Sequence, residues 1–251
     1  MKILASSLLL LTSPSLLADE IAPLVETSQK AHGLEAWWGK EVVSCEVSIV
    51  FGGQPMVDAT FTFQAHGPQA KMETRDGLTI LFDGETAWTT GEAHPMDRFH
   101  VLTWPWFVMA PYKMVGDGIT LSDYAEKKVG QTTYQTFLQT FASDMGDAPE
   151  DWYRLFIEPE TQQLDWMSYI VTYGKSAEEA NQKPSVIHYE DYASIEGVQI
   201  AQTYTFYLWD KEKSAPLGDP KGTGQVKEVR FLSAAEVDFT IPEGAQEIPL
   251  P

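Results

Sequence analysis

The chain has 251 residues and a formal net charge of −19, with 36 acidic residues against 17 Lys and Arg. This charge argues against binding to nucleic acid or to anionic membrane surfaces, because both carry charge of the same sign. The single cysteine excludes an internal disulfide framework, and the length is sufficient to bury a full core without one.

The start of the chain is typical of a secretory signal peptide. A lysine precedes a short apolar run at residues 3–11, and the small residue Ala18 stands just before the acidic Asp19. The run is too short to span a bilayer, and no later segment is apolar enough to do so. We therefore expect residues 1–18 to be removed, and residues 19–251 to form an exported, soluble protein in the periplasm or outside the cell.

Residues 21–90 show a helical pattern followed by a period of two. Apolar positions at residues 21–32 recur at helical spacing and stop at Gly33, and a second short helical piece covers residues 34–38. At residues 41–90, apolar and polar residues alternate between Gly-Gly and Asp-Gly turns, which predicts a meander of antiparallel strands, five in number. The side chains expected to point inward are Val43, Val47, Ile49, Val57, Phe61 and Phe63.

Residues 95–114 break this pattern. The segment is rich in large apolar residues and contains Pro95, Pro105 and Pro111. It is too interrupted by proline for one continuous helix and too apolar for an exposed loop. We expect one or two short helices that pack on the sheet.

Strand patterns resume after this helical segment. One pair forms a hairpin that is apolar on both faces, with Leu155 and Ile157 on one face and Phe156 on the other, so a core, a lid or a ligand must cover each face. No linker divides residues 19–251, which predicts a single domain. The expected strands lie at residues 119–127, 134–141, 152–158, 164–173, 185–193, 198–209, 224–231 and 237–241.

Three short sequences, in this order of elements, carry a resemblance to a known family. They are Leu-Phe-Asp-Gly-Glu-Thr-Ala-Trp at 81–88, Leu-Phe-Ile-Glu-Pro-Glu-Thr-Gln-Gln-Leu at 155–164 and Val-Asp-Phe-Thr-Ile-Pro-Glu-Gly at 237–244. The chain resembles the outer-membrane lipoprotein-carrier superfamily of periplasmic half-barrel proteins. The resemblance implies a mainly β (α+β) fold, an incomplete antiparallel β-barrel of about a dozen strands with an N-terminal helix and an inserted helical lid.

One turn departs from the family pattern. Lipoprotein carriers place an Arg-Pro pair after the second strand, and this arginine is thought to hold the cavity closed. Here the corresponding turn reads His66-Gly67-Pro68 and has no arginine. The departure counts against a lipoprotein as cargo and leaves the implied apolar cavity intact.

The sequence contains no nucleophile elbow, His-Glu-x-x-His site, paired cysteines, phosphate loop or dinucleotide fingerprint. His94, Asp97 and His100 could ligate zinc in a bent segment, but a polar lip on an apolar lid explains the same residues. Cys45 alternates in phase with core residues, and His188 has no visible catalytic partner. We therefore expect no enzyme activity, no metal and no cofactor. A solvated turn rather than a calcium loop is expected for Asp144, Asp147, Glu150 and Asp151.

The apolar surplus of the helical segment has two interpretations. It closes the end of the barrel as core, or it forms a mobile lid over an acyl-chain site, where Trp and Met accept flexible ligands. On the second interpretation the protein holds a lipid or acylated ligand between half-barrel and lid, by burial rather than by reaction. An envelope protein–protein module that uses the same apolar strip is the alternative, and a hydrolase is a weaker one. The candidate ligand-binding residues are Phe99, Trp104, Trp106, Phe107, Met109, Tyr112, Met114, Trp166 and Tyr169.

Overall fold

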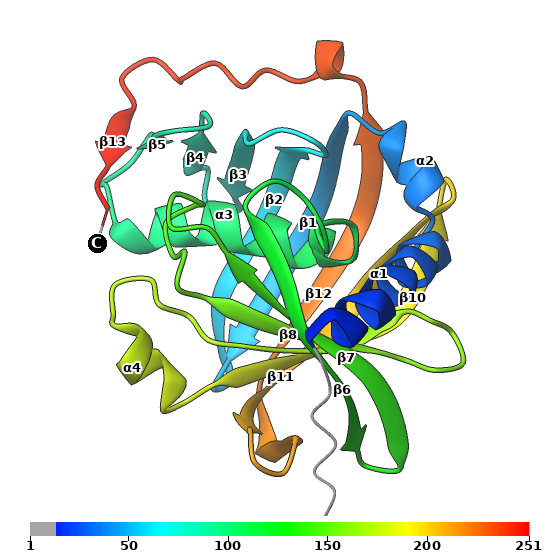
Figure 1. The fold of residues 1–251 in the computed structure, drawn as a ribbon. Coiled ribbons are helices and arrows are strands. Elements are labelled where there is room, and N and C mark those ends of the chain that lie inside the picture. Colours follow the sequence, from blue (N-terminus) through cyan, green and yellow to red (C-terminus); the bar gives the residue numbers. More distant parts are fainter. Residues whose placement is uncertain (1–13, 251) are drawn as a thin grey trace, which may run out of the picture.

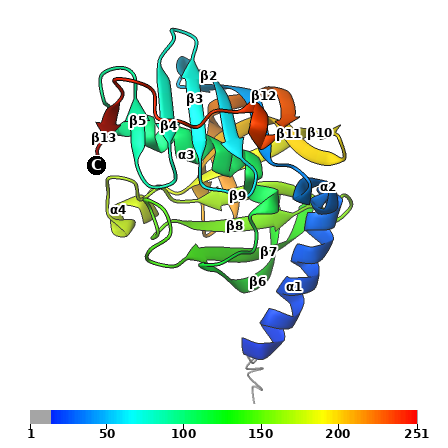
Figure 2. The same cartoon turned by 90° about the horizontal axis from the view of Figure 1, so that it is seen from above.

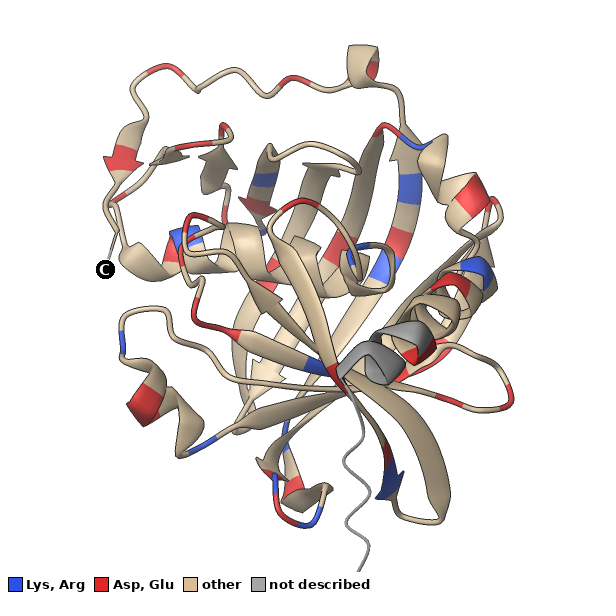
Figure 3. Ribbon diagram, viewed as in Figure 1, with Lys and Arg blue, Asp and Glu red and all other residues tan. Residues whose placement is uncertain are grey.

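The structure is a computed structural model that describes the backbone of residues 14–250 and the side chains of residues 20–250. The first thirteen residues of the expected signal peptide lie outside the described residues. Within the part that is described, no helix is both long enough and apolar enough to cross a membrane. Acidic side chains are spread over helices, strands and loops alike (Figure 3).

All the strands of the described chain belong to one antiparallel sheet of 13 strands (Figure 1). They are β1 (Val42–Phe51), β2 (Gln54–Gln64), β3 (Ala70–Thr74), β4 (Thr79–Phe82), β5 (Ala87–Thr89), β6 (Ile119–Val129), β7 (Thr132–Phe141), β8 (Trp152–Ile157), β9 (Leu164–Tyr169), β10 (Ser185–Ile195), β11 (Val198–Asp210), β12 (Ala215–Leu232) and β13 (Gln246–Ile248). Their spatial order is β13-β5-β4-β3-β2-β1-β12-β11-β10-β9-β8-β7-β6. The two end strands do not pair with each other, so the barrel is incomplete, as predicted.

The helices are few and short beside this sheet. They are α1 (Pro14–Ala31), α2 (Leu34–Trp38), α3 (Pro95–Met109) and α4 (Ala177–Asn181), with 3-10 turns η1 (Ala110–Tyr112) and η2 (Ala234–Glu236). Figures 1 and 2 show α3 crossing the interior of the curved sheet, with β1–β4 on one side and β7–β8 on the other.

The predicted meander of residues 41–90 is confirmed as β1 to β5, each paired with the next. Its six predicted inward side chains are all buried in one core cluster. Strand β12 pairs with the other side of β1, and from there the remaining strands run back in reverse chain order to β6. Period-two alternation was enough to predict β1 to β5, because one face of this meander packs on the core and the other does not.

The β8–β9 hairpin is covered on both faces, as its sequence requires. Leu155 and Ile157 belong to the main core inside the sheet, whereas Phe156 belongs to a second cluster on the outer face. Trp166 of β9 also lies in this second cluster, where its ring stacks on His188 at a centroid distance of 3.9 Å. A bulge between Phe156 and Ile157 shifts the pairing at that point.

Helix α1 begins at Pro14, seven residues before the predicted start at residue 21. Its last turn is joined to the sheet through the fully buried His32 that follows it. The ring Nδ1 lies 2.8 Å from the Ser28 carbonyl oxygen, and Nε2 accepts from the backbone N–H of Leu164 at 3.2 Å. Burial lowers the pKa of His32 to about 4, so the ring is neutral at physiological pH and donates from Nδ1.

Three sequence expectations outside the site were wrong. Residues 237–241 alternate like a strand, but they run along the rim of the sheet without a partner, and pairing starts only where β13 reaches β5 (Figure 1). The strand expected at residues 224–231 begins earlier, because residues 216–222 already belong to β12, where Pro216, Leu217 and Gly222 pair with β11. Helix α4 was missed, although Ser176 and Glu179 form a capping box at its start.

Candidate functional site

An apolar pocket of about 470 Å³ lies beside α3. Three parts of the chain form most of it: one face of α3, the end of β2 with the turn into β3, and residues 141–153 from the end of β7 to the start of β8. Phe82 of β4 and Tyr173 after β9 complete it. The lining residues are Phe63, Gln64, His66, Gly67, Pro68, Gln69, Ala70, Phe82, Phe99, Val101, Leu102, Thr103, Pro105, Trp106, Met109, Lys113, Phe141, Met145, Gly146, Asp147, Ala148, Asp151, Tyr153 and Tyr173.

Helix α3 is one continuous helix, so the expectation that proline would divide it was wrong. Pro95 stands in the first turn, where its missing N–H costs nothing, and the preceding His94 caps the helix by accepting from the Met96 N–H at 3.2 Å. Pro105 lies inside the helix, which costs about 3 kcal/mol. Burial offsets this cost, because each large apolar side chain that is buried contributes about 1.5–3 kcal/mol and Trp104 and Phe107 are both buried.

The two faces of α3 have different environments. The residues that face away from the pocket, such as Trp104, Phe107 and Val108, are buried in the main core. Phe99 and Trp106 are only half-buried and line the pocket. The helix is thus core on one side and pocket wall on the other.

Aromatic side chains of β7, β8 and the segment after β9 complete the apolar wall. The Trp106 ring packs on Phe141 at a centroid distance of 5.6 Å and on Tyr153 at 6.3 Å. At the other end of the helix, Phe99 packs on Tyr173 at 5.3 Å. Edge-on and tilted ring contacts of this kind stabilise packing without filling all the space between the rings.

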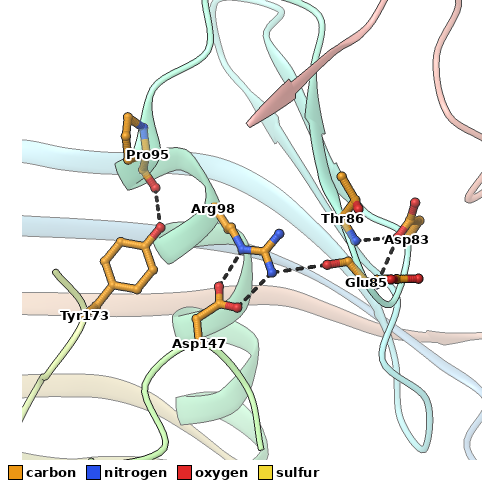
Figure 4. A network of polar contacts seen from close by, with 7 residues as sticks. All are labelled: Asp83, Glu85, Thr86, Pro95, Arg98, Asp147 and Tyr173. Carbon is orange, nitrogen blue, oxygen red and sulfur yellow. Dashed lines mark hydrogen bonds and ion pairs between the residues drawn. The ribbon is translucent and has the colours of Figure 1, made fainter. Parts of the chain in front are cut away.

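A buried ion pair joins α3 to the β7–β8 loop at the edge of the pocket (Figure 4). The Arg98 guanidinium donates to both carboxylate oxygens of Asp147, at 2.6 and 2.8 Å, and to the Glu85 carbonyl at 3.2 Å. Its guanidinium carbon also lies 5.1 Å from the centre of the Phe82 ring. Both partners are almost inaccessible, with side-chain exposures of 8% and 13%. The pair therefore holds the loop against the helix and the β4–β5 turn.

The 144–151 loop is not the fully solvated turn that its acidic residues predicted. Asp147 is held by Arg98, and Asp151 is buried, accepting from the Thr172 N–H at 2.6 Å and from the Thr172 hydroxyl at 2.8 Å. Burial raises the pKa of Asp151 to about 6, against the opposing effect of the two hydrogen bonds. This burial could not be predicted from the sequence, because Asp147 is paired with Arg98 of α3 and Asp151 with Thr172 of the segment after β9.

Among the residues that the structure describes, Lys113 is the only lysine or arginine that lines the pocket. It follows η1 and is half-buried. Burial lowers the pKa of its ammonium group. Among the residues with described side chains, no carboxylate lies within 4.0 Å of it.

The structure brings three of the nine predicted site residues to the pocket: Phe99, Trp106 and Met109. Five others are buried in the main core and do not line the pocket: Trp104, Phe107, Tyr112, Met114 and Tyr169. Trp166 does not line the pocket, because it lies on the outer face of β9, whereas the ring of Tyr169 contacts Phe107 of α3 at a centroid distance of 5.3 Å.

Sequence reasoning missed most of the lining residues because they come from separate segments. Phe63 and Phe141 lie near the ends of β2 and β7, Phe82 ends β4, and Met145 lies in the loop after β7. Each reads as an ordinary core or loop residue in its own strand. Only Tyr153, in the hairpin with two apolar faces, carried a signal that something must cover it.

The other candidates for chemistry have structural roles. His94 caps α3, and His100 accepts from the Trp104 indole N–H at 3.2 Å. Cys45 is buried in the core, and burial raises the pKa of its thiol to about 12. His188 lies on the outer face, 3.2 Å from an Asp165 carboxylate oxygen. Among the residues with described side chains, no group of three or more His, Cys, Asp or Glu is placed to hold a metal ion.

No protein-family model matches this sequence, and no curated protein matches it. The structure is similar to that of a LolA superfamily protein from Nitrosomonas europaea, with a TM-score of 0.54, 7% identity, and coverage of 87% of this chain and 96% of the other. It is also similar to a DUF1329 family protein from Desulfovibrio piger, with a TM-score of 0.52, 9% identity, and coverage of 89% of this chain and 97% of the other. Similarity at these identities concerns the fold alone. The incomplete barrel described above is thus similar in fold to a solved LolA superfamily protein, in agreement with the half-barrel fold that the sequence resemblance implied.

Proposed function

We propose that this protein is an exported binding protein that holds a lipid or an acylated ligand in the pocket beside α3. The observation that carries the proposal is the pocket itself: about 470 Å³, walled by aromatic and aliphatic side chains from three separate parts of the fold. Ligand pockets commonly have volumes of about 300–1,000 Å³ and mostly apolar linings. Half-buried aromatic side chains such as Trp106 are costly to leave facing water unless something covers them.

The mechanism that we infer is burial without reaction. Covering about 400 Å² of acyl surface contributes about 10 kcal/mol before the costs of association are subtracted. The ring contacts of Trp106 and the flexible side chains of Met109 and Met145 allow the wall to adjust to chains of different length. Asp147 is held in an ion pair and Asp151 accepts hydrogen bonds, and we assign no polar residue of the pocket a catalytic role.

Export and domain organisation belong to the same proposal. The signal-peptide pattern of residues 1–18 supports a periplasmic location, and a hydrophobic ligand that must cross an aqueous compartment needs a carrier of this kind. The membership of every described strand in one sheet supports a single domain for residues 19–251.

Lipid extraction and probe binding test the proposal. The exported protein is purified without detergent, its organic extract is analysed by mass spectrometry, and a fluorescent fatty-acid probe is titrated against it. We expect bound lipid and saturable probe binding, weakened about tenfold or more, or about 1.4 kcal/mol, by Trp106→Ala. Ala148→Trp, which adds bulk to the loop side of the pocket, should also reduce binding.

Trp152→Ala is the matched control. Trp152 is half-buried like Trp106, but it lies on the other face of β8 from Tyr153 and does not line the pocket. Probe binding should be unchanged in this variant. If the wild-type protein carries no lipid and binds no apolar probe, the binding proposal fails, and the alternative of a protein–protein module that uses the same apolar strip takes its place.

A further inference from the structure

The charged groups at the pocket are unequally compensated. Asp147 is paired with Arg98, and Asp151 accepts two hydrogen bonds from Thr172. Lys113 alone faces the pocket without a counter-ion among the described residues. A partly buried ammonium group without an anion is destabilised relative to water, and an anionic ligand group would compensate it.

The backbone around Lys113 is firmly held. Its N–H donates to the Met109 carbonyl at 3.1 Å, and its own carbonyl accepts from the Gln139 side chain at 2.7 Å. The hydroxyl oxygen of the preceding Tyr112 lies 2.8 and 2.7 Å from the carbonyl oxygens of His32 and Gln199, to which its one hydrogen can be donated. The start of the lysine side chain therefore has a fixed position at one end of the pocket.

The geometry of α3 separates this charged end from the apolar part. From Phe99 to Lys113 the helix and its 3-10 extension advance about 20 Å at 1.5 Å or more per residue. Phe99, Trp106 and Met109 line the pocket along this length, and Lys113 stands after them. One charged end and a long apolar wall match a molecule with an anionic head and an apolar chain.

We propose that the pocket binds an anionic amphiphile, with the Lys113 ammonium contacting a carboxylate or phosphate head group and the chain lying along the Phe99–Trp106 face of α3. This inference rests on the proposed binding function and names the chemistry of its ligand. Burial of the ammonium group, which lowers the pKa of Lys113, supports it. The acidic surface repels anions at a distance, but salt screens that repulsion beyond about 8 Å, so the close contact decides the preference.

A different explanation of Lys113 exists in the fold itself. A cation after the last turn of a helix is favoured by the helix dipole, and a lysine can cover apolar surface with its stem. That explanation accounts for the sign of the charge and predicts a loss of stability when Lys113 is replaced. It predicts no effect on ligand preference.

The test compares two ligands of equal chain length, hexadecanoate and hexadecanol, in displacement of a neutral fluorescent apolar probe at pH 8. The wild-type protein should bind the carboxylate about tenfold more tightly than the alcohol, or about 1.4 kcal/mol. Lys113→Met should abolish this preference by weakening hexadecanoate alone, and Lys113→Arg should retain it. Hexadecyl phosphate should behave like the carboxylate, whereas inorganic phosphate should not compete, because the apolar chain supplies the burial.

Lys128→Met is the matched control, since Lys128 is exposed on β6, does not line the pocket and carries the same charge. This variant should keep the preference for the carboxylate. Equal binding of both ligands by the wild type, or equal effects of the two Lys→Met variants, would overturn the proposal while leaving the binding function standing. Failure of every amphiphile to bind counts against the binding function itself. If Lys113→Met does not fold, Lys113→Gln gives the same comparison.

Discussion

The buried ion pair between Arg98 and Asp147 is the contact whose removal should be most costly at the pocket. Arg98→Ala leaves the Asp147 carboxylate, whose side chain is 13% exposed, without either of its two charged hydrogen bonds. Removal of one partner of a buried pair costs about 3–5 kcal/mol. Arg98→Ala also removes the hydrogen bond to Glu85 and the contact with the Phe82 ring. Because Asp147 lies at a pocket that water can enter, we expect the lower part of this range, about 3 kcal/mol.

Urea unfolding followed by circular dichroism measures this cost, and a double-mutant cycle isolates the pair. Asp147→Leu should cost a similar amount, because it leaves the arginine buried and unpaired. The double variant Arg98→Ala/Asp147→Leu should cost less than the two single changes together by about 2 kcal/mol or more, since it removes both charges. The β7–β8 loop should also be cut faster by protease in Arg98→Ala, because the pair is what fastens the loop to α3.

The pair between Lys40 and Glu196 provides the control. Its Nζ–Oε2 distance is also 2.6 Å, but the Glu196 side chain is 60% exposed. Removal of an exposed partner costs at most about 1 kcal/mol. If Glu196→Ala and Arg98→Ala destabilise the protein equally, burial does not set the strength of these pairs and the reasoning is wrong.

Further expectations concern stability, pH and processing. Trp104→Ala should cost about 3–5 kcal/mol as a core truncation, and half-buried Trp106→Ala should cost clearly less, measured by urea unfolding; equal costs would show that both rings are core. The pKa of His32 is about 4 in the fold against an ordinary value of 6.5, so its contribution to stability is complete above 6.5 and is lost as pH falls toward 4. Between pH 7 and pH 5 the wild type should therefore lose about 2 kcal/mol more than His32→Gln, and parallel pH profiles would contradict this. The raised pKa of Asp151, about 6, acts in the opposite direction, since its destabilising charge disappears as pH falls; Asp151→Asn should lose about 1 kcal/mol more than the wild type over the same interval. Intact-mass measurement of the exported protein should give a mature N-terminus at Asp19, and retention of the first 18 residues would remove the argument for export.

The local sequence pattern was sufficient to predict strands whose burial follows the alternation of apolar and polar residues. The alternation at residues 41–90 predicted five strands and their buried faces, because a strand with one covered face must place apolar residues at every second position. The hairpin of β8 and β9 could be predicted to be covered on both faces for the same reason. Cys45 could be placed in the core from its phase in β1 alone.

Elements that depend on a partner far away in the chain could not be predicted in this way. Residues 237–241 alternate like a strand but have no strand beside them, and pairing at residues 246–248 occurs only because the chain reaches β5 there. Pro105 would break an isolated helix, and it is tolerated in α3 because the sheet buries the residues around it. Trp166 is a large aromatic residue of the kind expected in an apolar site, but the alternation of side chains along β9 places it on the outer face of the sheet.

For the site, the sequence by itself determined that large apolar side chains gather in residues 95–114, and that the two apolar faces of the β8–β9 hairpin must both be covered. The tertiary structure decided which of those side chains meet the pocket, because that depends on how α3 is rotated against the sheet. It also brought Phe63, Phe141 and Tyr173 to the same wall, paired Arg98 with Asp147, and placed Lys113 at the pocket with no carboxylate partner among the described side chains. Each of these contacts joins residues far apart in the chain, and periodicity along a sequence reports burial but not the identity of the partner.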